Sequence, residues 1–241
     1  KRMEMGGKDM HIGGFQKMTA VDFPGRLACT IFLAGCNLRC PFCHNAGLVI
    51  PPYGEPAMGE EEIFAYLQKR RGMLEGVCVT DGEPLIHQDI DGLLARIRAL
   101  GYAVKLDTNG TVPDALARVL KANLVDYVAM DIKNMPARYA QTCGLSRLDT
   151  GLIEKSMTLL KQSGIGYEMR TTVVKEFHTV SDIEELARWI APYAKGYYLQ
   201  SFIDSGNTIQ KGLHACAPEE LAQMLARARA HIPGAALRGI R

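Results

Sequence analysis

The stretch LACTIFLAGCNLRCPFCHN, residues 27–45, runs from an apolar segment directly into three closely spaced cysteines. Its first nine residues are nearly all apolar, which is typical of a parallel β-strand that is covered on both faces. Cys36, Cys40 and Cys43 follow at the carboxyl end of that expected strand. In parallel βα architectures the loops at this end of the strands carry the chemistry. The stretch therefore predicts both a βα fold and the place of its site.

The same alternation of short apolar runs and longer amphipathic segments continues along the chain, and it indicates a βα fold. Strands are expected at residues 27–35, 76–80, 102–108, 126–132, 167–174 and 196–202. Helices are expected at residues 59–73, 87–100, 113–122, 150–163, 181–194 and 218–231. Six such units predict an open, partial TIM-like (β/α)6 barrel whose parallel strands are covered by helices.

No linker rich in Ser, Gly or Pro divides the 241 residues, so we expect a single domain. Residues 1–26 would form an N-terminal lead-in, 27–202 the barrel, and 203–241 a C-terminal helix and tail. The formal charge of +2 and the scattered basic residues do not indicate nucleic-acid binding. The sequence shows neither a secretory signal nor an apolar run long enough to span a bilayer, which predicts a cytoplasmic protein without a membrane partner.

Polar residues follow nearly every expected strand. These segments are TDGEP (80–84), DTNG (107–110), MDIK (130–133), MRTT (169–172), which leads to His178, and LQSF (199–202). One such turn would be ordinary loop polarity. Several of them at the carboxyl ends of parallel strands predict a shared site at one mouth of the barrel.

Three clustered thiols in a chain with seven cysteines indicate metal or redox chemistry rather than a disulfide framework. Zinc is the less favoured alternative, because a structural zinc site needs four ligands and the adjacent Cys43 and His44 would point in divergent directions. The other cysteines are expected either within apolar strands or isolated along the chain: Cys29 and Cys78, and Cys143 and Cys216. Three thiolates on a four-iron cluster would leave one iron open to another ligand.

The spacing Cys36-x3-Cys40-x2-Cys43 resembles the signature of radical S-adenosylmethionine (SAM) enzymes. The resemblance implies a 4Fe-4S cluster on the three thiolates, with the amino and carboxylate groups of SAM on the fourth iron. Residues 22–45 are similar to the glycyl-radical-enzyme activases, and residues 12–25 to the branch that activates anaerobic ribonucleotide reductase. The resemblance covers nearly the whole chain. It implies reductive cleavage of SAM to a 5′-deoxyadenosyl radical, which generates a glycyl radical on a partner enzyme without any acid-base residue.

The resemblance also assigns side chains around SAM. The DGEP turn matches a glycine-glycine-glutamate-proline turn that receives the SAM amino group, and Glu83 is its acid. Asp107, Thr108 and Asp131 match positions that in the pyruvate formate-lyase branch lie beside a monovalent cation, for which their oxygens are suitable ligands. The expected contacts to SAM are Asn45, Gly82, Glu83, Asp107, Asp131, Lys133 at the carboxylate or ribose, Arg170, and His178 near the adenine.

Simpler alternatives remain open for several of these residues. Glu83 could be a solvated loop carboxylate, Asp107 and Asp131 could be N-caps of helices, and His178 could be a surface histidine. The sequence also departs from the resembled turn at Asp81, where its first glycine would lie. Asp tolerates a left-handed backbone, so we expect the turn to survive with the Asp81 side chain turned away from SAM.

The partner enzyme is less clearly indicated than the chemistry. Residues 12–25 favour anaerobic ribonucleoside-triphosphate reductase, while pyruvate formate-lyase and a small-molecule substrate remain alternatives. Residues 46–75 contain no cysteine, which disfavours the activases with a ferredoxin-like insert. Flavodoxin or ferredoxin is the expected electron donor. The basic end, residues 227–241, could help to dock the partner, although a solvated helix face is the preferred interpretation.

Overall fold

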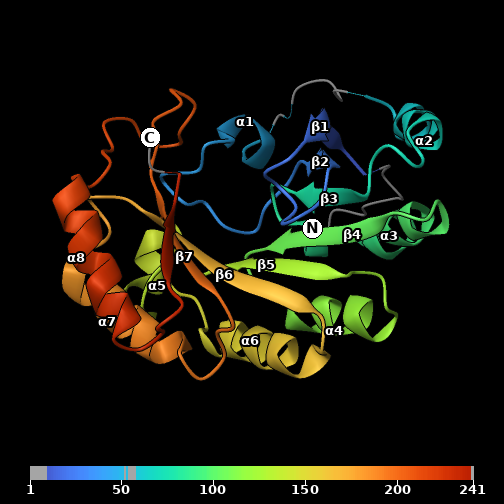
Figure 1. The fold of residues 1–241 in the computed structure, drawn as a ribbon. Helices are drawn as coiled ribbons and strands as arrows, with labels where there is room; N and C mark the ends of the chain where they lie inside the picture. The colour runs from blue at the N-terminus through green and yellow to red at the C-terminus, as the bar shows by residue number, and fades with distance from the viewer. Residues whose placement is uncertain (1–9, 52, 54–57, 240–241) are drawn as a thin grey trace, which may run out of the picture.

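The computed structural model describes residues 10–51, 53 and 58–239, and its centre is an eight-stranded sheet. The strands lie side by side in chain order (Figure 1). Their bounds are β1 Ile12–Thr19, β2 Ala28–Leu33, β3 Gly76–Thr80, β4 Ala103–Thr108, β5 Tyr127–Asp131, β6 Gly166–Val173, β7 Tyr197–Ser201 and β8 Ala236–Arg238. β1 pairs with β2 in antiparallel fashion, and the pairings from β2 to β8 are parallel.

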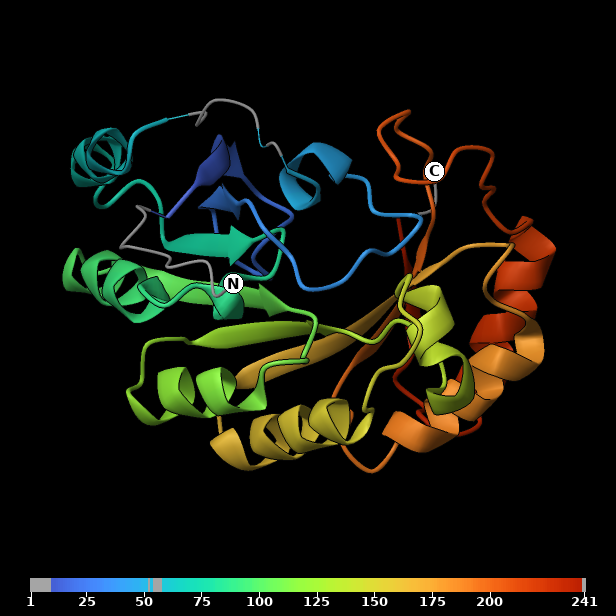
Figure 2. The same cartoon turned by 180° about the vertical axis from the view of Figure 1, so that it is seen from behind.

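Helices connect the parallel strands and lie along the outside of the curved sheet (Figures 1 and 2). The longer ones are α2 Glu60–Lys69, α3 Ile90–Ala99, α4 Pro113–Lys121, α6 Gly151–Ser163, α7 Val180–Ile190 and α8 Pro218–Arg229. The short ones are α1 Ala46–Val49, the 3-10 helix η1 Pro84–Ile86 and α5 Pro136–Thr142. This arrangement is the expected open, partial TIM-like barrel.

The six strands predicted from apolar runs are present as β2 to β7, each within two residues of its expected ends. The prediction missed both edge strands. β1 lies in the segment expected to be a lead-in, and its Gly13 and Gly14 are residues that strands usually lack. β8 has only three residues, too few for a detectable period. Residues 1–9 of the predicted lead-in and 240–241 of the predicted tail lie outside the described residues.

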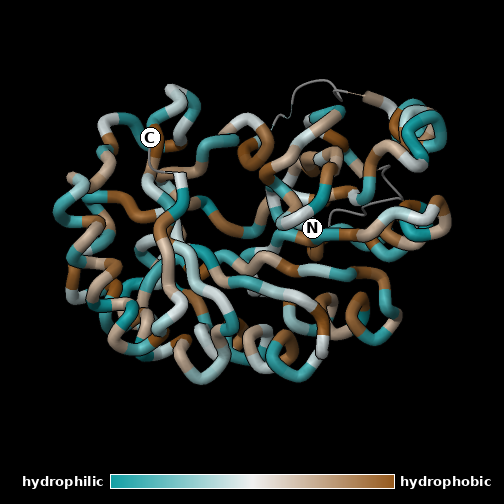
Figure 3. Tube along the Cα trace, in the orientation of Figure 1, coloured by the Kyte–Doolittle hydropathy of each residue, from teal (hydrophilic) through white to brown (hydrophobic). Residues whose placement is uncertain are grey.

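A hydrophobic core fills the space between the sheet and its helices. Val104 and Leu106 of β4 belong to it, together with Leu116 and Val119 on the apolar face of α4. Lys105 and Asp107 alternate with them along the strand, and a strand period of two turns these two side chains toward the inside of the barrel. Figure 3 shows this interspersion of hydrophobic and hydrophilic residues along strands and helices. Within the described residues, no helix has the length and apolar character needed to cross a bilayer.

Candidate active site

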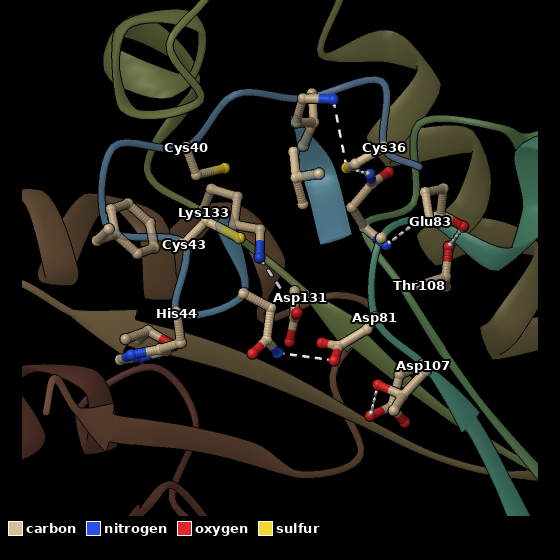
Figure 4. Close-up of a pocket in the computed structure, with 18 residues that line it drawn as sticks. Cys36, Cys40, Cys43, His44, Asp81, Glu83, Asp107, Thr108, Asp131 and Lys133 are labelled. Carbon is tan, nitrogen blue, oxygen red and sulfur yellow. Dashed lines mark hydrogen bonds and ion pairs between the residues drawn. The ribbon is translucent and has the colours of Figure 1, made fainter. Parts of the chain in front are cut away.

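The clustered cysteines lie in the loop that follows β2, and all three line one pocket (Figure 4). The backbone N–H of Leu38 donates to Cys36 Sγ over 3.4 Å, and the backbone N–H of Cys43 donates to the Cys40 carbonyl over 2.9 Å. These local bonds fold the loop back on itself. All three cysteines are free of disulfides. Their thiols are therefore available to a common ligand.

The three thiols differ in how easily they lose a proton. Burial raises the pKa of Cys36 to about 11, and it also raises the pKa of Cys43. A hydrogen bond with Cys143 lowers the pKa of Cys40 to about 7, and the Lys133 ammonium adds to this effect. Cys143 caps α5 and was expected to be isolated. The fold brings it beside Cys40, which no feature of the linear spacing indicates.

Glu83 is fully buried and joins two of the strand-end loops. Its carboxylate accepts hydrogen bonds from the Leu85 N–H at 3.1 Å, the Thr108 hydroxyl at 2.8 Å and the Asn109 N–H at 2.6 Å. Burial raises its pKa to about 7. The interpretation of Glu83 as a solvated loop carboxylate is therefore wrong. The residue lines the pocket and holds the DGEP turn against the DTNG loop.

The DGEP turn approaches the cysteine loop backbone to backbone. Asp81 and Gly82 both have left-handed conformations, with φ of 62° and 50°. A Cβ on Gly82 would lie 2.0 Å from the Gly35 carbonyl oxygen, so only glycine permits this contact. The same carbonyl accepts a hydrogen bond of 2.8 Å from the Glu83 N–H. The left-handed backbone expected at Asp81 is thus present, and the turn is preserved.

Asp81 lines the pocket, and its orientation relative to SAM stays a prediction. Its Oδ2 accepts a hydrogen bond of 2.7 Å from Asn45 Nδ2 (Figure 4). Burial raises the pKa of Asp81 to about 6. This hydrogen bond ties the end of the cysteine loop to the DGEP turn, and the sequence gives no sign of it.

Asp107 and Asp131 are strand residues near the carboxyl ends of β4 and β5. The helices that follow have other N-caps, Val112 for α4 and Met135 for α5. The N-cap interpretation is therefore wrong. Both carboxylates line the pocket, as Thr108 does.

Arg170 of β6 links the two carboxylates from below the pocket. Its Nη2 lies 3.2 Å from Asp107 Oδ2, and its Nε lies 2.9 Å from Asp131 Oδ1. Lys133 Nζ lies 3.1 Å from the other oxygen of Asp131. Burial alone would raise the pKa of Asp131, but the charges of Arg170 and Lys133 lower it to about 2. Asp131 is therefore a fixed negative charge beside the cysteines.

His178 lies behind the pocket and is absent from its lining. The residue is 3% exposed, so the surface-histidine interpretation is wrong. Its Nδ1 accepts a hydrogen bond of 3.1 Å from the Val174 N–H, which leaves the proton on Nε2. Nε2 donates to the Lys133 carbonyl over 2.8 Å. His178 thereby fixes the backbone that carries Lys133, and its contact with adenine stays a prediction.

Several polar residues that support the site were missed by sequence reasoning: Thr80, Lys105, Asn109, Cys143 and Thr172. Lys105 could have been recognised, because it precedes Asp107 by two residues in a strand and so shares its face. The others acquire their role from contacts between loops that are distant in sequence.

The pocket fits a 4Fe-4S cluster and SAM. Three free thiols supply sulfur ligands, and the backbone of the turn at Gly82 packs against the loop that carries them. Asp81 offers a partner for an ammonium group, while Lys133 offers one for a carboxylate. An amino-acid head group such as that of SAM carries both charges.

The profile of the Radical SAM superfamily matches residues 30–190, a span that contains the three clustered cysteines. The chain therefore belongs to the radical SAM superfamily. It is a radical SAM enzyme, and its cofactors are a 4Fe-4S cluster and SAM.

Individual relatives resemble the chain over most of its length. A "Putative glycyl-radical enzyme activating enzyme" of Methanocaldococcus jannaschii is 31% identical over 74% of this chain and 75% of its own. The 7-carboxy-7-deazaguanine synthase of Thermococcus kodakarensis is 26% identical over 71% of this chain and 72% of its own.

The solved structure of Streptococcus suis SuiB bound to S-adenosylmethionine superimposes with a TM-score of 0.64 at 16% identity. The superposition covers 86% of this chain and 48% of SuiB, so the chain spans about half the length of that enzyme. At this identity the likeness shows a common fold.

Proposed function

We propose that the chain is a glycyl-radical-enzyme activase, and that anaerobic ribonucleoside-triphosphate reductase is its partner. The main support is the 31% identity to the M. jannaschii protein over about three quarters of both chains. The segment 12–45 supports the same assignment, because it resembles the activases beyond the three cysteines that all radical SAM enzymes need. All cysteines of the chain are free, which agrees with action in the cytoplasm.

The proposed reaction transfers one electron and one hydrogen atom. An external reductant, flavodoxin or ferredoxin, supplies the electron that breaks the bond between sulfur and C5′ of SAM. The products are methionine and a 5′-deoxyadenosyl radical, which takes a hydrogen atom from the Cα of a partner glycine. The 4Fe-4S cluster, when bound, relays the electron.

The side chains of the pocket would bind and orient SAM. In this proposal Asp81 and the backbone of the DGEP turn receive the ammonium group of SAM, and Lys133 receives its carboxylate. Asn45 holds Asp81 in place through their 2.7 Å hydrogen bond. No side chain needs to move a proton, because the reaction exchanges an electron and a hydrogen atom.

A second hollow beside the pocket offers a path for a polypeptide. It is lined by His44, Asn45, Ala46, Gly47, Leu48, Asn207, Thr208 and Lys211. It shares His44 and Asn45 with the pocket, so a segment lying in it would reach the SAM site. The small side chains of Ala46 and Gly47 would let another backbone approach closely. A loop of the partner that carries a glycine fits this path.

The test is to incubate the reconstituted chain with SAM, reductant and purified partner enzymes, and to record EPR spectra. We expect a glycyl radical on anaerobic ribonucleotide reductase, and no radical when the Cys40→Ala protein replaces the wild type. A radical on pyruvate formate-lyase alone would support the assignment as an activase and refute the proposed partner. SAM cleavage with no glycyl radical on any partner would contradict the proposal.

A second candidate is radical chemistry on a small molecule, which the 26% identity to the T. kodakarensis synthase favours. Formation of 5′-deoxyadenosine would then depend on a small purine-like substrate and not on a protein. The same incubation distinguishes the two candidates. The formation of 5′-deoxyadenosine is measured once with a partner enzyme added and once with the small molecule added.

A further inference from the structure

Lys105 is a buried lysine inside the barrel, directly beneath the SAM pocket. The residue is 1% exposed and lies on the same face of β4 as Asp107. Its ammonium forms an ion pair with Asp107 Oδ1 and lies 3.7 Å from Cys78 Sγ. Lysines are almost never this deeply buried unless they are paired, so the pairing with Asp107 is what holds Lys105 in place.

The two carboxylates expected beside a monovalent cation are already satisfied by side chains. Asp107 Oδ1 pairs with Lys105, while its Oδ2 accepts from Thr80 Oγ1 at 3.0 Å and pairs with an arginine. The two oxygens of Asp131 bind Arg170 and Lys133. These contacts leave no carboxylate oxygen of either residue without a cationic partner.

The third expected ligand is engaged as well. The Thr108 hydroxyl donates its proton to Glu83 at 2.8 Å and accepts from the Gly110 N–H at 3.1 Å. The ligand set that the family resemblance implies is present in sequence, but it does not fit an added cation.

The charge balance points the same way. Two carboxylates, Asp107 and Asp131, face three cationic side chains, Lys105, Lys133 and Arg170. Lys105 is buried and the other four side chains are partly buried, so solvent screens these charges only in part. A further cation at Asp107 or Asp131 would have to displace one of these side chains from its carboxylate oxygen. If Lys105 were absent, one oxygen of Asp107 would lose its only cationic partner in a place where an unpaired charge is costly.

We propose that the Lys105 ammonium takes the place of the monovalent cation in this chain. Lys105 acts as a positioning residue: it fixes Asp107, and through Arg170 it fixes Asp131 and Lys133 at the SAM pocket. SAM binding by this enzyme therefore needs neither potassium nor sodium. The inference concerns SAM binding alone, so it holds whichever partner the enzyme activates.

The wild-type enzyme provides the first test. The dissociation constant of SAM is measured by isothermal titration on reconstituted, oxidised protein, in which SAM is not cleaved. The only monovalent cation in the buffer is potassium, sodium or tetramethylammonium, at equal ionic strength. We expect dissociation constants within about twofold of one another. Binding at least tenfold tighter in potassium or sodium would overturn the proposal without any variant.

Two variants give the second test. Lys105→Ala removes the ammonium and leaves space for an ion, whereas Lys105→Met removes the ammonium and keeps the volume filled. We expect both variants to bind SAM at least tenfold more weakly in tetramethylammonium. Potassium or sodium should restore most of the affinity of Lys105→Ala and little of that of Lys105→Met.

Iron content and thermal unfolding of each variant are compared with the wild type before titration. Two results from a folded, iron-loaded Lys105→Ala protein would overturn the proposal. Unchanged affinity in every buffer would mean that the ammonium has no role. Weak affinity that no cation restores would mean that Lys105 only supports the fold. The wild-type series decides the question if Lys105→Ala fails to load iron.

Discussion

Replacing Gly82 by alanine tests how the DGEP turn is held against the cysteine loop. The new Cβ would lie 2.0 Å from the Gly35 carbonyl oxygen, whereas real Cβ contacts are essentially never under 3.0 Å. The two backbones must therefore separate by about 1 Å. Because Gly35 directly precedes Cys36, this displacement moves a cluster ligand.

The expected loss of stability has two parts. A side chain at φ of 50° costs roughly 1–2 kcal/mol for the left-handed backbone. Overpacking against a neighbouring backbone costs about 1–3 kcal/mol more. Together they give a loss of about 2–5 kcal/mol in the free energy of unfolding. Gly72→Ala is the matched control, because φ is 78° there and nothing lies within 4 Å of the added Cβ.

The assays are thermal unfolding, iron content and the SAM dissociation constant. In Gly72→Ala the free energy of unfolding should fall only by the roughly 1–2 kcal/mol of the left-handed backbone. This corresponds to a fall of about 2–8 °C in Tm, and iron content and SAM binding should be unchanged. Gly82→Ala should show a larger fall in Tm, incomplete iron loading and SAM binding at least tenfold weaker. If the two variants matched in all three measurements, the close approach of the two loops would have no role in assembling the site.

Three further predictions concern the pocket. Cys40→Ala should hold no 4Fe-4S cluster, while Cys216→Ala should hold a full one. Iron and sulfide analysis after anaerobic reconstitution measures both, and a full cluster in Cys40→Ala would refute the ligand assignment. The pKa of Asp81 is raised from 3.8 to about 6, so the folded state binds the extra proton and the free energy of unfolding falls as pH rises from 4 to 6. Asp81→Asn should therefore stabilise the metal-free protein by about 3 kcal/mol at pH 8 and by less than about 1 kcal/mol at pH 4, as urea unfolding at both pH values would show; an equal effect at both would contradict it. Arg170→Met leaves two partly buried carboxylates short of a partner and should cost up to about 3–5 kcal/mol in the same assay, and a loss under 1 kcal/mol would mean that the pairs contribute little.

The barrel could be predicted from the sequence because its parallel strands are buried on both faces. Segments such as 76–80 and 127–131 are then apolar enough to stand out between helices. The edge strands could not be predicted in the same way. β1 contains two glycines, and its antiparallel pairing with β2 depends on a register that only the folded sheet defines.

Some residues of the site could be predicted from the sequence and others could not. Cys36, Cys40 and Cys43 could be recognised because a local spacing carries their chemistry. The contact between Cys143 and Cys40 joins segments far apart in sequence, and local spacing does not reveal it. The burial of Glu83 likewise depends on donors from another loop, which is why a solvated carboxylate was a fair alternative.

Reductive cleavage of SAM by the reconstituted enzyme is the reaction that most directly tests its assignment as a radical SAM enzyme. Protein carrying four irons per chain is mixed anaerobically with SAM and a low-potential reductant, and 5′-deoxyadenosine is measured by chromatography. We expect 5′-deoxyadenosine and methionine in equal amounts, formed only when reductant is present. A chain that holds the complete cluster and binds SAM, yet forms no 5′-deoxyadenosine, would contradict this assignment.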